Sequence, residues 1–261
     1  MAGGFVRSIS LLRDRVPSFE AYPFAIPAIR ALRTLDLHPK VTFFVGENGV
    51  GKSTLIEAIA VAAGFNAEGG SKNFRFATRR SESDLHEALR LVRGARRQKD
   101  GFFLRAESLF NVATQIEQLS DGGNSGPGSG VMQGYGGVSL HEQSHGESFL
   151  ALALHRFRGQ GLYVLDEPEA ALSPGRQLAL LALIDQHVQE RGSQFIIATH
   201  SPILMAYPDA IIYQLAADSG IAAIAYEDTE HFQVTRDFLL DRQSFFTHLF
   251  SRDDLDADPA R

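Results

Sequence analysis

The chain has 261 residues, of which 44% are hydrophobic and 21% charged, so it can bury an ordinary core as one large domain or two small ones. Its net charge of −6 argues against a protein that is basic overall and coats DNA nonspecifically. It has no Cys, which excludes disulfides, thiolate metal sites and a cysteine nucleophile. The longest apolar run is too short for a membrane span and the first ten residues have no signal-peptide core, so we expect a cytoplasmic protein.

The first 64 residues predict a strand–turn–helix unit behind a more irregular start. Residues 1–37 mix short apolar runs with prolines, which is typical of short strands, turns and one helical turn. The sequence Val-Thr-Phe-Phe-Val over 41–45 predicts a buried strand. A glycine-rich turn then leads to a predicted helix over 52–63, which Gly64 ends.

The next segment is basic and then rich in glycine. Residues 65–100 hold most of the basic charge, and apolar residues recur at helical spacing at Leu85, Leu89 and Val92. Beyond it the sequence predicts a strand, a helix and a long glycine- and serine-rich loop, over 101–105, 108–119 and 121–137.

The rest of the chain alternates predicted helices and strands. The predicted helices cover 146–157, 174–190 and segments between 227 and 250, and the predicted strands cover 162–165, 194–199, 211–215 and 221–226. This alternation indicates an α/β fold with a sheet covered on both faces. We expect the acidic residues 252–261 to form a disordered tail.

A phosphate-binding loop is predicted between the strand over 41–45 and the helix over 52–63. The motif G-x-x-x-x-G-K-[ST] is fitted by Gly46, Glu47, Asn48, Gly49, Val50, Gly51, Lys52 and Ser53, followed by Thr54. Glycines let backbone N–H groups approach phosphate oxygens, and the helix N-terminus favours an anion. Lys52 is expected to reach the β- and γ-phosphates of ATP, and the Ser53 hydroxyl to bind Mg²⁺. A chance glycine-rich turn would lack this strand-before, helix-after context.

Two carboxylates, Asp166 and Glu167, end the strand predicted over 162–165. Ligands of open α/β sheets bind at the carboxyl ends of strands. Asp166 is therefore predicted to hold Mg²⁺ through water, and Glu167 to orient or deprotonate the attacking water. The alternative is an acidic pair that only caps the following helix.

His200 follows the strand predicted over 194–199, as Asp166 follows its own strand. A lone histidine is more often a surface or core residue than a catalytic one. At this position, however, it could face the γ-phosphate, because a neutral imidazole can both donate and accept a hydrogen bond.

A second anion site is predicted where Ser144, His145, Gly146 and Glu147 open a helix. With the phosphate loop and the acidic strand, this sequence resembles the ABC-type ATPase superfamily, whose signature is a Ser-Gly-Gly-Gln-type segment. The resemblance implies that Ser144, Gly146 and Glu147 bind the γ-phosphate held by a second subunit, so that ATP is clamped in a homodimer. It also implies that His200 is the switch histidine.

The resemblance further implies an ABC-type ATPase head of the P-loop NTPase fold. Such a head has a mainly parallel core sheet, an antiparallel β subdomain and a helical lobe, here placed over about 65–148 of a single domain over 1–251. The segment 166–174 is similar to the RecF/OLD-like and SMC-like branch. Together with residues 103–108, it resembles small stand-alone bacterial AAA-family ATPases.

The chain departs from the family pattern in several places. In the signature segment His145 replaces a Gly, and Glu147 stands where transporters usually carry Gln. Ser173 stands where the loop after the acidic strand usually ends in Asp. The glutamine of the family's Gln loop has no clear match, although Gln115 and Glu107 are candidates.

Three functions stay open at this point. The first is a stand-alone ATPase that switches a partner protein or a nucleic-acid process; only about 90 residues separate Lys52 from Ser144, too few for an SMC-type coiled-coil arm. The basic stretch over 72–99 could contact DNA, although such helix faces are usually solvated.

The second possible function is that of the nucleotide-binding subunit of a membrane transporter, which the variant signature and the missing Gln loop disfavour. The third, a monomeric P-loop kinase or GTPase, conflicts with the signature-like segment and with the absence of an Asn-Lys-x-Asp tetrapeptide.

Overall fold

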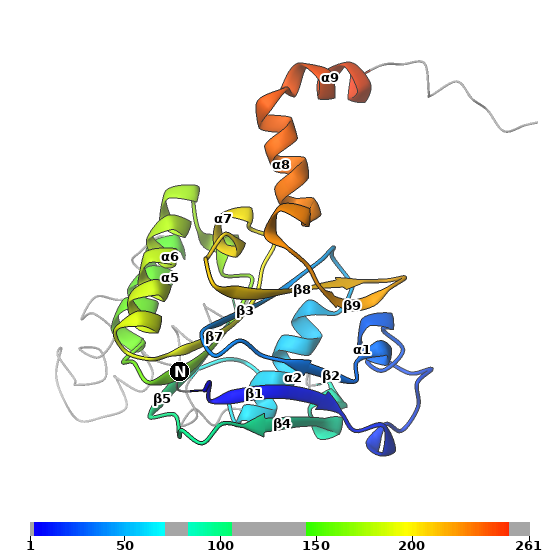
Figure 1. Cartoon of the computed structure of the whole chain (residues 1–261), viewed down its shortest axis with the longest axis vertical. Coiled ribbons are helices and arrows are strands. Elements are labelled where there is room, and N and C mark those ends of the chain that lie inside the picture. The colour runs from blue at the N-terminus through cyan, green and yellow to red at the C-terminus, as the bar shows by residue number, and fades with distance from the viewer. Residues whose placement is uncertain (1–2, 71–82, 106–144, 251–261) are drawn as a thin grey trace, which may run out of the picture.

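The computed structural model describes residues 3–70, 83–105 and 145–250, and these form two sheets with helices around them (Figure 1). A three-stranded antiparallel sheet has the order β2-β1-β4, with β1 Val6–Leu11, β2 Thr34–Asp36 and β4 Leu89–Arg93. A six-stranded sheet has the order β5-β6-β7-β3-β8-β9, with β3 Val41–Val45, β5 Asp100–Arg105, β6 Gly161–Asp166, β7 Gln194–Ala198, β8 Ala210–Ala216 and β9 Gly220–Ala223.

The helices follow the predicted alternation. The described α-helices are α1 Pro27–Ala31, α2 Lys52–Ala63, α5 His145–Arg156, α6 Pro174–Gln189, α7 Pro202–Met205, α8 Glu230–Leu240 and α9 Arg242–Phe250. Short 3₁₀ turns occur at η1 Arg13–Arg15, η2 Asp84–Ala88, η4 Pro168–Ala171 and η5 Tyr226–Asp228.

The six-stranded sheet is parallel except at β9, which pairs with β8 antiparallel. Strand β7 lies between β3 and β6, so the segments that follow these three strands meet at one edge of the sheet. In the register of the pairing, Asp166 lies opposite Ala198, and Phe44 lies opposite the same residue from the other side. This strand order brings the phosphate loop, the acidic segment and His200 together.

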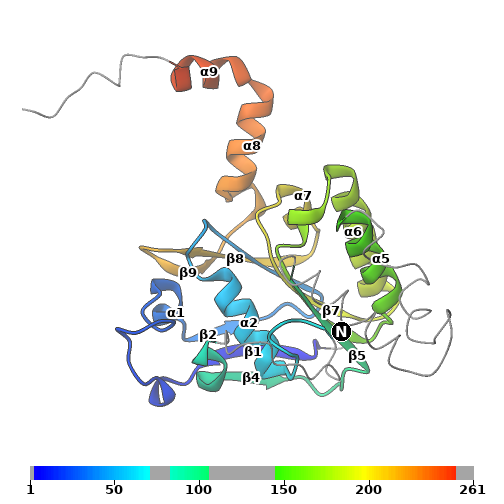
Figure 2. The ribbon, with the colours of Figure 1, turned by 180° about the vertical axis from the view of Figure 1, so that it is seen from behind.

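Each face of the six-stranded sheet has its own hydrophobic core. One core includes Leu55, Ile56 and Ile59 of α2, which lies between this sheet and the three-stranded sheet (Figure 2). The other core includes Leu180 and Ile184 of α6 together with residues of α5 and α7. A sheet buried on both faces explains why strands such as β3 and β7 are apolar throughout rather than alternating.

The buried side chain of Gln194, on β7, joins the six-stranded sheet to the three-stranded sheet by hydrogen bonds. The pairing of β1 with β4 shifts register between Val6 and Ser8, and the backbone groups of Val6 bond to the side chain of Gln194 instead. Gln194 Oε1 accepts from Val6 N–H at 2.9 Å, while Nε2 donates to Val6 O at 2.8 Å and His38 O at 3.0 Å. Because Gln194 has no exposed surface, these bonds replace contacts with water.

The C-terminal helices α8 and α9 project away from the body of the molecule in both views (Figures 1 and 2). Phe238 of α8 packs edge-on against Phe245 and Phe246 of α9, which joins the two helices. Large apolar side chains remain exposed along them, namely Val234, Leu239, Leu240, Leu249 and Phe250.

The α/β fold with a mainly parallel sheet and a separate antiparallel sheet is confirmed. The helix expected from the spacing of Leu85, Leu89 and Val92 is wrong, because residues 89–93 form β4 and pair with β1. The available partner strand overrides the helical periodicity there. The strand predicted over 221–226 ends earlier, at Ala223. The helix over 108–119, the loop over 121–137 and the tail over 252–261 lie outside the described residues, and the division into one domain with a lobe over 65–148 remains a prediction.

Candidate functional site

The phosphate loop joins β3 to α2 at the edge where the parallel strands end. Gly46 and Gly51 have φ values of 139° and 100°, a region that favours glycine. A Cβ atom on Gly46 would lie 2.2 Å from the backbone oxygen of Leu215 in β8, so the loop can run this close to β8 only with glycine there. The helix N-terminus at Lys52 supplies the unpaired N–H groups and positive dipole end that bind an anion.

Lys52 is buried at the start of α2, and its ammonium lies inside the loop. Lys52 Nζ donates to the backbone oxygens of Gly46 and Glu47, both at 2.9 Å. Burial lowers the pKa of Lys52, and nearby carboxylates, with Glu167 the strongest, oppose that shift. The ammonium is thus placed where phosphate oxygens can replace the loop carbonyls as its partners.

Ser53 and Asp166 meet across the sheet edge and form a pair of oxygen donors. Ser53 Oγ donates to Asp166 Oδ1 at 3.0 Å, and Arg105 Nε lies 3.6 Å from Asp166 Oδ2. Arg105 also pairs with Glu57 of α2 at 2.7 Å, which fixes its position. A hydroxyl and a carboxylate suit Mg²⁺, which typically takes one or two protein ligands and fills the rest with phosphate oxygens and water. Within the described ranges no group of three or more His, Cys, Asp or Glu residues is arranged so that it could hold a metal ion.

Glu167 adopts a backbone conformation that is unusual for a residue with a side chain. Its φ is 49° and its ψ is 52°, in the left-handed region, which typically costs about 1–3 kcal/mol for a non-glycine residue. Its backbone N–H donates to Ala198 O at 3.0 Å, so the strained turn is held against the end of β7. Strain retained directly after Asp166 is what a site that aims a carboxylate requires.

His200 lies between Glu167 and a second histidine. His200 Nε2 is 3.5 Å from Glu167 Oε1, and its backbone N–H donates to Glu169 Oε1. On the other side, His200 Nδ1 lies 2.9 Å from Nε2 of His231, on the first turn of α8. Burial, reinforced by the charge of Lys52, lowers the pKa of His200, so the imidazole is biased toward its neutral form.

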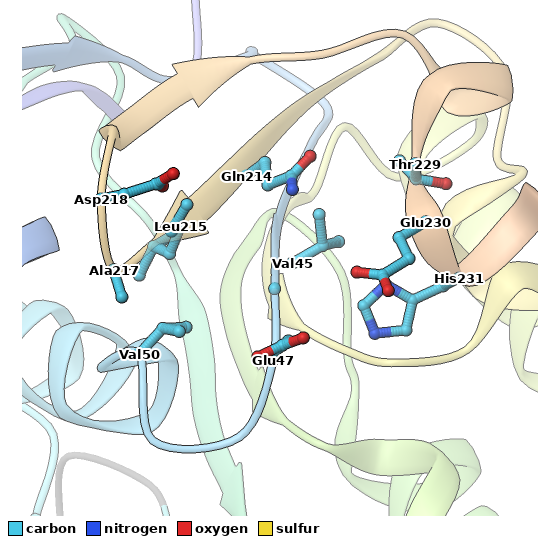
Figure 3. A pocket seen from close by; sticks show the side chains of 12 residues that line it. Val45, Glu47, Val50, Gln214, Leu215, Ala217, Asp218, Thr229, Glu230 and His231 are labelled. Carbon is cyan, nitrogen blue, oxygen red and sulfur yellow. The ribbon is translucent and has the colours of Figure 1, made fainter. Parts of the chain in front are cut away.

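The first turn of α8 stands beside the phosphate loop and borders two cavities. One has a volume of about 280 Å³ and lies between the phosphate loop, the end of β8 and the start of α8, where Glu47, Glu230 and His231 face it (Figure 3). The other has a volume of about 520 Å³ and is also lined by Asn48 and His200. Both cavities therefore open at the phosphate loop.

The structure brings together the backbone of the phosphate loop and five of the predicted site side chains, those of Lys52, Ser53, Asp166, Glu167 and His200. Thr54 lies one residue further along α2, where its Oγ1 is 3.4 Å from the hydroxyl of Tyr22. Ser144 lies outside the described residues. Gly146 and Glu147 lie in the first turn of α5, and their placement relative to a second subunit remains a prediction.

Three residues of the site escaped sequence reasoning. Arg105 ends a parallel strand, so the rule that pointed to Asp166 could have found it. Glu169 follows two other carboxylates, and nothing in the sequence distinguishes it as the one that holds the backbone of His200. His231 reaches the site from a helix 31 residues further along, and no spacing or motif signals it.

Two protein families match parts of the chain. Residues 25–122 match a family described as "AAA domain", and residues 112–206 match one described as "AAA domain, putative AbiEii toxin, Type IV TA system". The thiamine import ATP-binding protein ThiQ of Rhizobium meliloti strain 1021 is 33% identical over 89 residues, which is 34% of this chain. The match spans 36% of that relative, about a third of its length.

Solved structures that resemble the chain in part include an SMC head domain and a component of an ABC transporter complex. One is the SMC head domain from Thermotoga maritima, at 17% identity and a TM-score of 0.48, covering 86% of this chain and 100% of that one. Another is cbiO1 from Clostridium perfringens, part of the ABC transporter complex cbiONQ, at 18% identity and a TM-score of 0.48, covering 84% and 91%. The two AAA-domain matches, together with the phosphate loop and the neighbouring Ser53–Asp166 pair, support a P-loop ATPase of the AAA/ABC type.

Proposed function

We propose that this protein binds ATP with Mg²⁺ and hydrolyses it at a site shared by two copies of the chain, and that this cycle switches a partner protein or a nucleic-acid process. The observation that carries the proposal is the convergence of Lys52, Ser53, Asp166, Glu167 and His200 at one sheet edge. Lys52 and Ser53 open the helix that follows β3, and the other three lie at or just beyond the carboxyl ends of β6 and β7, where ligands bind in this class of sheet.

The chemistry follows from the protonation states and distances. Lys52 would exchange its loop carbonyls for phosphate oxygens and offset their charge. Glu167 would orient a water molecule and accept its proton as that water attacks the γ-phosphate. Neutral His200, 3.5 Å from Glu167, would donate to the γ-phosphate oxygen from Nε2. Mg²⁺, held by Ser53 and Asp166, would supply neutralisation of the phosphate charge.

The shared site accounts for a second anion-binding helix end. Helix α5 begins at His145, so Gly146 and Glu147 lie in its first turn, where an anion can bind. One phosphate loop does not need two such sites. We therefore place this segment against the γ-phosphate held by the other copy, which makes ATP the link between two chains.

A transporter subunit is the second candidate, because the matched relative is named as a thiamine import ATP-binding protein. That match covers 34% of the chain. No helix in the described part of the chain is long and apolar enough to cross a bilayer. A match to a family described with a type IV toxin–antitoxin system favours the switching role instead.

The first experiment measures ATP hydrolysis and size together for the Glu167→Gln variant. Replacing the carboxylate by an amide removes the proton acceptor but keeps the shape, so we expect kcat to fall by about 10²–10⁴-fold with ATP binding retained. In ATP and Mg²⁺ this variant should accumulate as a dimer by size-exclusion chromatography with light scattering. A variant that binds ATP yet stays monomeric would contradict the shared site.

The second experiment mixes two inactive variants. Ser144→Arg should block hydrolysis while leaving ATP binding by the monomer, whereas Lys52→Ala should lose most ATP binding. If sites are shared, a mixed dimer contains one site with both residues intact, so activity should partly return on mixing.

A third experiment separates the switching role from the transporter role. The Glu167→Gln variant is retrieved with ATP, and the protein and nucleic acid bound to it are identified. A membrane protein recovered in equal amounts would favour the transporter role.

A further inference from the structure

A pair of neighbouring histidines connects the candidate γ-phosphate sensor to helix α8. His200 Nδ1 and His231 Nε2 are 2.9 Å apart, with ring centroids 5.0 Å apart and the rings inclined at 57°. The 2.9 Å separation is a hydrogen-bond distance for two nitrogen atoms. Exactly one of the two nitrogens must therefore carry the shared proton when both rings are neutral.

The groups around His200 decide which nitrogen that is. On the Nε2 side of His200 lies the Glu167 carboxylate at 3.5 Å, and the proposed γ-phosphate would lie there too. Both are acceptors, so a proton on Nε2 is favourable and a bare Nε2 lone pair is not. With the proton on Nε2, neutral His200 has an unprotonated Nδ1, which must accept its hydrogen bond from Nε2–H of His231.

The charged groups facing the pair favour two neutral rings over an imidazolium. Burial lowers the pKa of His200, and the Lys52 ammonium lowers it further against the opposing carboxylate of Glu167. Burial also lowers the pKa of His231, again helped by Lys52, while Glu230 and Glu47 oppose that shift. When both rings are neutral, one proton lies in the hydrogen bond between His200 Nδ1 and His231 Nε2, so the tautomer of one ring sets the tautomer of the other.

Helix α8 begins in a fixed position relative to His200. Helix α7 starts two residues after His200, and the Tyr226 hydroxyl donates to Pro202 O at 3.0 Å. Thr229, the buried residue that precedes α8, donates from Oγ1 to Tyr226 O at 2.7 Å. His231 is thus held by the same short segment that carries the sensor, rather than by a free surface helix.

We propose that His231 is a positioning residue that donates from Nε2 to His200 Nδ1 and so holds His200 in the tautomer that presents Nε2–H to Glu167 and the γ-phosphate. The proposal rests on the proposed ATPase function for its kinetic consequence, but the tautomer itself does not depend on hydrolysis. His231 lies outside both segments that match known families, on helix α8, which projects beyond the sheet (Figure 1).

Kinetics of two substitutions at one position test the proposal. His231→Phe keeps a ring of similar size but removes the donor, and we expect kcat to fall about fivefold to tenfold, the value of one neutral hydrogen bond, with KM changed by less than about twofold. His231→Gln supplies an amide N–H at a similar distance and should restore most of that loss. His248→Phe, on α9 where the ring bonds to the backbone of its own helix, is the matched control and should leave kcat unchanged. Equal kcat for His231→Phe and wild type would overturn the proposal.

The tautomer is measured directly by ¹⁵N chemical shifts of labelled histidine rings. In the wild-type protein we expect the His200 ring to be protonated at Nε2 and bare at Nδ1, and in His231→Phe we expect the two tautomers to mix. A wild-type His200 protonated at Nδ1, or shifts unchanged by the substitution, would overturn the inference even if the protein proved to have no ATPase activity. Wild-type protein with the expected shifts but no hydrolysis would instead refute the proposed function and leave the histidine pair standing.

Discussion

Substituting Gln194 by Leu should weaken the junction between the two sheets more than a single side chain normally does. The substitution removes three hydrogen bonds and leaves three backbone groups without these partners, namely the buried N–H and C=O of Val6 and the partly buried C=O of His38. An unsatisfied buried polar group costs about 1–3 kcal/mol, and a carbonyl lies at the lower end, so the loss should be about 3–5 kcal/mol. This is a large part of the 5–15 kcal/mol that stabilises a typical domain.

Urea unfolding followed by circular dichroism measures this loss, because the chain has no Trp to report by fluorescence. Gln186→Leu is the matched control: Gln186 is exposed on α6 and bonds at 3.2 Å to Glu190 at the end of the same helix, so its loss should stay within about 0.5 kcal/mol. Gln194→Glu should be about as harmful as Gln194→Leu, because it loses the amide donor and buries a charge. If Gln194→Leu lost less than about 1 kcal/mol, the amide would not be what joins the sheets.

Two further predictions concern pH and the phosphate loop. Burial lowers the pKa of His187 from 6.5 to about 4, so as the pH falls the unfolded chain takes up a proton before the folded chain does. The free energy of unfolding should therefore stay constant above pH 6.5 and be lower by about 2 kcal/mol at pH 5. His187→Phe should flatten this pH dependence, and the same pH dependence in the variant and the wild type would disprove the assignment. Gly46→Ala should abolish nucleotide binding measured by calorimetry, since its Cβ would lie 2.2 Å from Leu215 O at a φ of 139°, and unimpaired affinity would show that the loop does not need this approach.

The site residues that adjoin a recognisable strand or helix pattern could be predicted, because the functional residues and the pattern that sets the element are neighbours in the sequence. The phosphate loop follows a run of apolar β-formers and precedes good helix formers, so its context is visible over some twenty residues. Asp166 and His200 each end an apolar strand, and the topology then places both strands next to the loop, as the rule for parallel sheets anticipates.

Contacts between distant segments could not be predicted in this way. The spacing of Leu85, Leu89 and Val92 fits a helix, yet β1 lies alongside and converts residues 89–93 into a strand, a choice made by tertiary pairing. His231 meets His200 because α8 packs beside the phosphate loop, and Gln194 satisfies Val6 because a register shift frees that backbone. Each of these depends on where a remote element packs, which no local pattern records.

Helix α8 projects from the body of the molecule, so a small tilt at its first turn would become a larger displacement at its far end (Figure 1). It has 11 residues, so it is about 16 Å long at 1.5 Å per residue, and its first turn carries His231 while its last carries the exposed Leu239 and Leu240. A tilt of about 10° at that first turn would displace the far end of a rigid helix of this length by about 3 Å. A change too small to alter the fold around the phosphate loop is therefore magnified at an apolar surface that lies well outside it.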